Sequence, residues 1–89
     1  MEKIRKHFYF SGRVQGVGFR YRSYYIAQSM GLTGWVKNLY DGSVEMEVEG
    51  EEPLIDELII FMQNRTYVWI ENMDAKSIPL EHDNGFYER

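Results

Sequence analysis

A stretch of nine residues, Gly12 to Arg20, constrains the fold of this chain most, because its sequence GRVQGVGFR separates two segments of different periodicity. Before it, apolar and polar residues alternate over residues 4–10, as in a β-strand. After it, apolar and small residues recur with helical spacing at Phe19, Ser23, Ile26, Ala27 and Met30. The sequence therefore predicts a strand, a glycine-rich bend and a helix in direct succession.

Such a bend has the properties of an anion-binding cradle. Residues such as Gly16 and Gly18 allow successive backbone N–H groups to turn toward one point, and the first turn of a helix leaves N–H donors unpaired. Arg20, at the start of the predicted helix, adds a planar guanidinium group that suits phosphate or carboxylate. Two nucleotide motifs do not fit. Walker A needs Lys followed by Ser or Thr after its second glycine, and the Rossmann motif needs glycine where Tyr21 stands.

The composition limits the classes of protein further. With 89 residues, we expect a single domain over residues 1–89. The absence of cysteine excludes disulfides, thiolate nucleophiles and cysteine-based zinc sites. No apolar run approaches the ~20 residues of a membrane-spanning helix, and the first residues lack the pattern of a signal peptide. We therefore expect a cytoplasmic protein with no membrane partner.

The charge is distributed unevenly along the chain. Residues 1–40 hold seven Lys or Arg and one acid, a net +6, whereas the remaining residues have a net −10, against −4 for the whole chain. Positive charge near the bend is what an anion site needs. Strands and helices with solvated charged faces would give the same asymmetry.

The middle of the chain predicts a hairpin. Asp41-Gly42 favours a tight turn between strands at residues 33–39 and 43–49, and Gly31 ends the preceding helix. In the second strand, apolar residues alternate with glutamates, so one face is buried and the other meets water.

The second half predicts one helix and two further strands. Residues 51–53 supply acids and a proline suited to a helix start, and an amphipathic pattern continues to about Asn64. Residues 67–70 with Met73 predict a fourth strand, and residues 86–89 a short final one. The order βαββαβ predicts an α+β, ferredoxin-like sandwich, a mostly antiparallel sheet with both helices on one face.

Asn38 is a candidate partner of the bend. It lies near the end of the first hairpin strand. We expect the crossover through the first helix to bring this strand end near the bend. Its amide both donates and accepts hydrogen bonds, so it suits holding a water beside a bound anion. The alternative is a turn asparagine that satisfies its own backbone.

Taken together, these residues resemble the acylphosphatase family. The resemblance rests on GRVQGVGFR, on Ala27 and Gly31-Leu32, and on GWVKN from Gly34 to Asn38 with DGSVE after it. It covers about the first fifty residues closely and the remainder loosely. The first motif is specific in a chain of this size, and the second follows at the expected distance.

The resemblance implies a metal-independent enzyme without a cofactor that hydrolyses small acyl phosphates to a carboxylate and inorganic phosphate. It implies that Arg20 binds the phosphoryl group together with backbone amides of the bend, and that Asn38 orients the attacking water. The residues of the bend implied in substrate binding are Gln15, Gly16, Val17, Gly18, Phe19 and Arg20.

The last third departs from the family pattern. The second helix is followed by Asn64-Arg65-Thr66 where a glycine-proline turn is common, and Glu88 stands where the final strand usually has an apolar residue. These departures concern the edge of the sheet rather than the two motifs. His7 and His82 have no partner at metal-ligand spacing, so no metal is expected.

Two other functions occur on the same fold. A nucleic-acid module on the same fold is disfavoured, because the RNP1 pattern is absent and the pI is about 5.1. The alternative is a non-catalytic module that binds carbamoyl phosphate or another anion, since similar domains begin larger carbamoyl-transfer proteins. We expect a monomer, given the small size and the covered sheet face.

Overall fold

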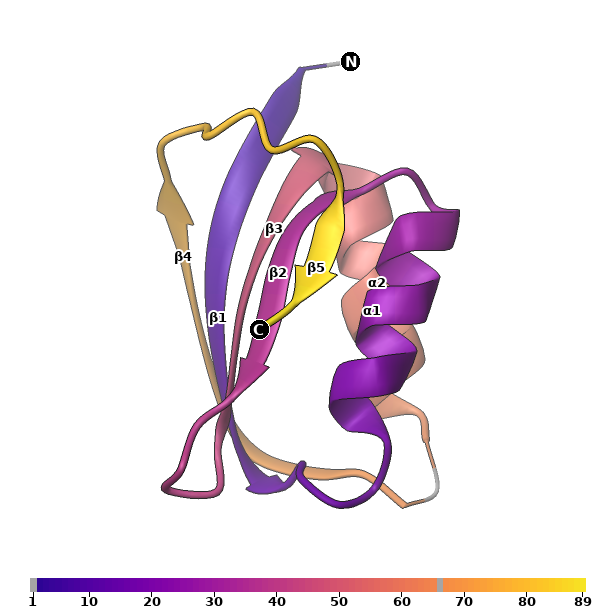
Figure 1. The fold of residues 1–89 in the computed structure, drawn as a ribbon, viewed down its shortest axis with the longest axis vertical. Coiled ribbons are helices and arrows are strands. Elements are labelled where there is room, and N and C mark those ends of the chain that lie inside the picture. Colours follow the sequence, from indigo (N-terminus) through magenta and orange to yellow (C-terminus); the bar gives the residue numbers. More distant parts are fainter. Residues whose placement is uncertain (1, 66) are drawn as a thin grey trace.

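The computed structural model describes residues 2–65 and 67–89, and its order of elements confirms the predicted βαββαβ arrangement with a fifth, short strand (Figure 1). The elements are β1 (Lys3–Arg13), α1 (Phe19–Ser29), β2 (Thr33–Asn38), β3 (Val44–Glu51), α2 (Glu52–Gln63), β4 (Trp69–Ile78) and β5 (Phe86–Glu88). Within the described residues, no helix is long and apolar enough to cross a membrane.

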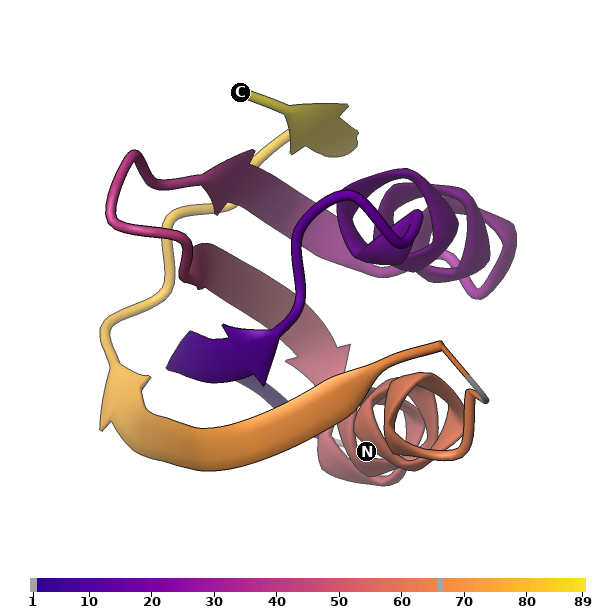
Figure 2. The ribbon, with the colours of Figure 1, turned by 90° about the horizontal axis from the view of Figure 1, so that it is seen from below.

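The strands form one sheet in the order β4-β1-β3-β2-β5, and both helices lie on the same side of it (Figure 2). Neighbouring strands are antiparallel except for β5, which pairs parallel to β2. The sheet is therefore mixed rather than wholly antiparallel. The reason is the last connection, which crosses the end of the sheet from β4 on one edge to the opposite edge (Figure 1).

The core fills the space between this sheet and the two helices. The predicted alternation is confirmed, because Phe8 and Phe10 are buried whereas His7 and Tyr9 are partly exposed. The Phe10 and Phe19 rings lie 5.0 Å apart, so α1 begins against β1. Each fully buried side chain of this kind contributes about 1.5–3 kcal/mol. The core residues that are wholly inaccessible to solvent include Phe10, Val14, Ala27, Val36, Val44, Met46, Val48, Ile55, Leu58 and Met62.

Strand β1 is longer than predicted and extends through Gly12 to Arg13. Its pairing with β4 shifts register between Ser11 and Gly12, which is a β-bulge. Gly12 has φ of +119°, and a Cβ there would collide with the backbone oxygen of Trp69. Gly12 therefore belongs to β1, where the absence of a side chain allows β4 to approach closely. The bend is formed only by the residues after β1 ends at Arg13.

Both helices end where the sequence predicts. The helix α1 finishes in a Schellman motif, in which Leu32 N–H donates to the Ala27 carbonyl at 2.9 Å and Gly31 N–H donates to the Gln28 carbonyl at 3.1 Å. Gly31 has φ of +75°, as such a motif requires. Asn64 caps α2.

The fourth strand begins and ends later than predicted. We expected residues 67–70 with Met73, whereas β4 runs from Trp69 to Ile78. Most of its side chains are exposed, because it is an edge strand, so no apolar alternation marks its length. The departure predicted at Asn64-Arg65-Thr66 includes Thr66, which lies outside the described residues.

Candidate active site

The predicted bend and Asn38 line one hollow at the end of the molecule where β1 ends, α1 begins and β2 ends. Figure 1 shows this meeting point at the lower end of the sheet. Strands β1 and β2 both pair antiparallel to β3, so they run parallel to each other, and β2 ends at the same end of the sheet as β1, where α1 begins. The residues lining the hollow are Val14, Gln15, Gly16, Gly18, Phe19, Arg20, Tyr21 and Asn38.

Apolar anchors and glycines together shape the bend. Val14 and Phe19 are buried at its two ends and fix it to the core. Between them, Gly16 and Gly18 have φ of +73° and +81°, a backbone conformation that side chains with a Cβ rarely adopt. Val17 is half-buried and its side chain does not line the hollow.

The start of α1 leaves backbone donors free for a ligand. Gly18 is the N-cap residue, and no side chain among the described residues caps the helix. The first intrahelical bond runs from Arg22 N–H to the Gly18 carbonyl at 2.9 Å, so the preceding N–H groups have no partner within the helix. With the partial positive charge of a helix N-terminus, this arrangement suits an anion.

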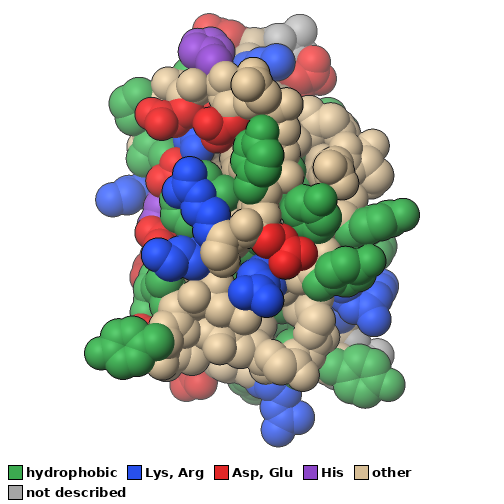
Figure 3. Space-filling model, in the orientation of Figure 1, with side chains coloured by type: hydrophobic (Ala, Val, Ile, Leu, Met, Phe, Trp, Pro, Cys, Tyr) green, Lys and Arg blue, Asp and Glu red, His purple; other side chains and the backbone are tan. Residues whose placement is uncertain are grey.

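Arg20 stands in the first turn of α1, and 41% of its side chain is exposed. Its Nε lies 3.6 Å from Glu88 Oε2 on β5. Lys and Arg side chains gather across the middle of the face that Figure 3 presents. The guanidinium is therefore accessible at the hollow and carries the permanent charge that a phosphoryl group needs.

Asn38 is the last residue of β2, and its side-chain oxygen Oδ1 is buried. Among the residues that the structure describes, no donor reaches that oxygen. The alternative of a turn asparagine that bonds its own backbone is therefore wrong for Oδ1. Asp41 has that role instead, because its Oδ1 accepts from Ser43 N–H at 3.0 Å.

The structure shows how the predicted tight turn at Asp41-Gly42 is formed. Gly42 N–H donates to the Leu39 carbonyl at 3.2 Å, Leu39 N–H donates to the Ser43 carbonyl at 2.8 Å, and Gly42 has φ of +95°. This is a type I turn followed by a glycine bulge. Hydrogen bonds from Ser43 and Tyr9 lower the pKa of Asp41 to about 2, so its carboxylate stays charged and holds the turn.

Gln15 joins the two halves of the site. Its Nε2 donates to the backbone carbonyl of Leu39 and, at 2.8 Å, to that of Ser43. The resemblance implied a role for Gln15 as part of the bend and did not predict this side-chain contact, because the contact depends on where the hairpin packs. The sign of this contact in the sequence is a long amide side chain within a glycine-rich bend.

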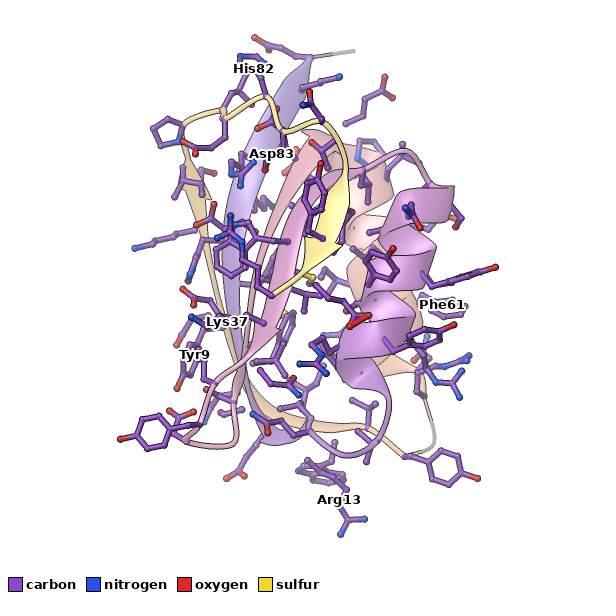
Figure 4. All side chains as sticks on the ribbon, in the orientation of Figure 1. Tyr9, Arg13, Lys37, Phe61, His82 and Asp83 are labelled. Carbon is purple, nitrogen blue, oxygen red and sulfur yellow. The ribbon has the colours of Figure 1, made fainter. Side chains whose placement is uncertain are left out.

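The charged and aromatic residues near the bend differ in whether they line the hollow. Arg13 and Lys37 are exposed and do not line it, and Figure 4 shows Arg13 pointing away from the lower end of the molecule. Tyr21 has 61% of its residue surface exposed and does line the hollow. Residues 2–65 and 67–89 contain no cluster of three or more metal-ligating side chains.

Comparison with known proteins identifies the family. The model of the Acylphosphatase family matches residues 6–87. An acylphosphatase of Pseudomonas paraeruginosa is 39% identical over 90 residues, covering 100% of this chain and 99% of the relative. An acylphosphatase of Trichormus variabilis is 52% identical over 56 residues, a match that covers 63% of this chain and only 55% of the relative's length.

A solved structure agrees with these sequences. The structure of an acylphosphatase from Coxiella burnetii matches with a TM-score of 0.89 and 34% identity, covering 98% of this chain and 93% of that one. Sequence and fold thus point to the same group of proteins. The chain belongs to the acylphosphatase family.

Proposed function

We propose that this protein hydrolyses the carboxyl-phosphate bond of small acyl phosphates, releasing a carboxylate and inorganic phosphate. The observation that carries the proposal is that Asn38, whose buried Oδ1 lacks a donor among the described residues, lines the same hollow as the bend and Arg20. An anion cradle alone would bind phosphate. A cradle with the amide of Asn38 beside it can also hold a water.

The bend and Arg20 bind the phosphoryl group in this proposal. Backbone N–H groups of Gln15, Gly16, Val17, Gly18, Phe19 and Arg20 surround the phosphoryl oxygens, and the Arg20 guanidinium donates to them as a planar fork. The transition state of phosphoryl transfer is loose, with its charge on the three equatorial oxygens. Fixed donors around those oxygens therefore stabilise the transition state more than the substrate.

Asn38 orients the attacking water. In this proposal the Asn38 amide hydrogen-bonds the water and turns a lone pair of the water oxygen toward phosphorus. A carboxylate at this position would repel the anionic substrate, whereas the amide carries no charge.

The reaction then needs no basic side chain. The water oxygen forms a bond to phosphorus, the bond from phosphorus to the acyl oxygen breaks, and the carboxylate leaves with the electron pair. The proton of the water passes to an oxygen of the transferred phosphate. Neither histidine lines the hollow, because His7 lies 2.8 Å from Glu45 on the sheet and His82 lies 3.8 Å from Glu49.

Hydrolysis of benzoyl phosphate tests this function. The wild-type protein should release phosphate without added metal, and Arg20→Ala should abolish turnover. A non-catalytic module that binds carbamoyl phosphate would instead show phosphate affinity without turnover in the wild type. That result would exclude the enzyme and favour the alternative.

A further inference from the structure

Glu88 brings a carboxylate to the arginine of the site. Its Oε2 lies 3.6 Å from Arg20 Nε, and 33% of the Glu88 side chain is exposed. The register explains the direction, because Glu88 pairs with Val36, which is fully buried on the face of the sheet that the helices cover. Residues paired across two strands share a face, so the Glu88 side chain extends toward α1.

The contact is an ion pair and not a hydrogen bond. At 3.6 Å, the distance from Arg20 Nε to Glu88 Oε2 exceeds hydrogen-bonding distance. In the described part of the chain, Arg20 is the one cation within ion-pair distance of Glu88. Because 41% of the Arg20 side chain is exposed and Arg20 lines the hollow, its guanidinium remains accessible to an incoming anion.

We propose that Glu88 is a built-in counter-ion that competes with the phosphoryl group for Arg20 and so weakens the binding of substrate and of phosphate. This inference rests on the proposed function, since it assigns Arg20 to the bound phosphoryl group. Without a ligand, Glu88 balances the charge of Arg20. When a phosphate dianion arrives, two anions share one guanidinium and repel each other.

The partly exposed position sets the size of the effect. Solvent screens the repulsion between Glu88 and bound phosphate, so removing the carboxylate should strengthen phosphate binding by about 3–10-fold rather than by orders of magnitude. Weaker binding of inorganic phosphate helps an enzyme whose product keeps the anionic group that the cradle recognises. Glu88 thus favours product release at the cost of affinity.

The sign of the effect separates this role from simple positioning. If Glu88 only held Arg20 in place, its removal would weaken anion binding and lower kcat together. A counter-ion has the opposite effect on affinity. Tighter binding after loss of the carboxylate is therefore an outcome that a purely structural role does not produce.

Calorimetric titration with inorganic phosphate, together with benzoyl phosphate kinetics, tests the inference. Glu88→Gln should bind phosphate about 3–10-fold more tightly than wild type, and KM should fall in proportion while kcat changes less than about twofold. Glu88→Asp, which keeps the charge, should restore near wild-type affinity. Glu57→Gln, on the exposed side of α2, removes the same charge elsewhere and should leave the affinity within about twofold.

A second uncharged variant, Glu88→Leu, guards against local misfolding of the Gln variant, because an apolar side chain suits this face of the sheet. Equal or weaker phosphate binding by both uncharged variants would overturn the inference. Failure of the proposed function is seen separately, as a wild type that binds phosphate but does not hydrolyse benzoyl phosphate. The titration still measures the effect of Glu88 in that case.

Discussion

The Gln15 side chain donates a hydrogen bond to the backbone carbonyl of Leu39, the residue that follows Asn38. One amide therefore connects the glycine-rich bend to the end of β2, where Asn38 lies. The same nitrogen also donates to the Ser43 carbonyl at 2.8 Å. The relative position of the two halves of the site depends on this link.

Replacing Gln15 by Ala should therefore reduce catalysis, although in the proposed function only the backbone N–H of Gln15, and not its side chain, contacts the substrate. The cradle and Asn38 lose their connection, and small misplacements of reacting groups cost up to about 10²-fold in rate. We expect kcat for benzoyl phosphate to fall by about 10- to 100-fold and stability by about 1–2 kcal/mol. Gln28→Ala, on the exposed side of α1, is the control, and equal losses in both variants would contradict the link.

Asn38→Ala should lower kcat by about 10²–10³-fold, the scale of one lost preorganised group in an active site. Affinity for inorganic phosphate should change little, because the cradle and Arg20 remain. Steady-state kinetics and phosphate titration on the same preparation check both statements, with Asn72→Ala on the exposed edge strand β4 as the control. Full turnover by the Asn38 variant would show that its amide does not orient the water.

Arg20→Lys should lose most of the hydrolytic activity, although the positive charge is kept. An ammonium group cannot reproduce the planar fork that donates to two phosphoryl oxygens at once. We expect kcat/KM to fall on the order of 10²-fold. The neighbouring exposed Arg22 provides a matched comparison, and Arg22→Lys should retain wild-type kcat/KM. If both lysine variants were fully active, Arg20 would act only through its charge.

Stability depends on a buried ion cluster distant from the hollow. Arg5 is only 2% exposed and contacts Glu47 at 2.8 Å, Asp83 at 3.1 Å and Glu49 at 3.2 Å. Removing one member leaves buried charges unpaired, so Arg5→Met should cost about 3–5 kcal/mol in urea unfolding. Lys6→Met replaces a neighbouring, more exposed cation and should cost far less.

The same cluster makes stability sensitive to acid. Burial alone would raise the pKa of Glu49, but hydrogen bonds from Glu81 N–H, Arg5 and His82 N–H outweigh it and lower that pKa below its ordinary value of 4.5. A lowered pKa in the folded state stabilises the protein above pH 4.5, and this contribution is lost as pH falls through the folded-state value. The free energy of unfolding should therefore decrease below pH 4.5. Glu49→Gln should flatten that part of the profile, and an unchanged slope would contradict the assignment.

The predictable parts of the molecule are those encoded by local chemistry. The alternation before the bend, the glycines at Gly16 and Gly18, the helical stripe and the stop at Gly31 each act over a few residues, so the sequence alone predicted them. The meeting of Asn38 with the bend follows from the parallel direction of β1 and β2, which are joined by the crossover through α1. The catalytic roles of Arg20 and Asn38 stay predictions.

The remainder depended on tertiary packing. Strand β4 carries exposed side chains along an edge, so no period marked where it ends. The β1 bulge at Gly12 reflects the close approach of Trp69, a distant residue. The contacts made by Gln15 and Glu88 likewise join segments far apart in the chain. Local sequence patterns do not reveal which distant side chains will meet.

A crystal structure with inorganic phosphate bound tests the central claim most directly. We expect one phosphate in the hollow, with its oxygens accepting from the backbone N–H groups of the bend and from the Arg20 guanidinium, and with Asn38 beside it. A water between Asn38 and the phosphate would complete the proposed arrangement. Phosphate bound elsewhere, with the hollow empty at saturating concentration, would contradict the account.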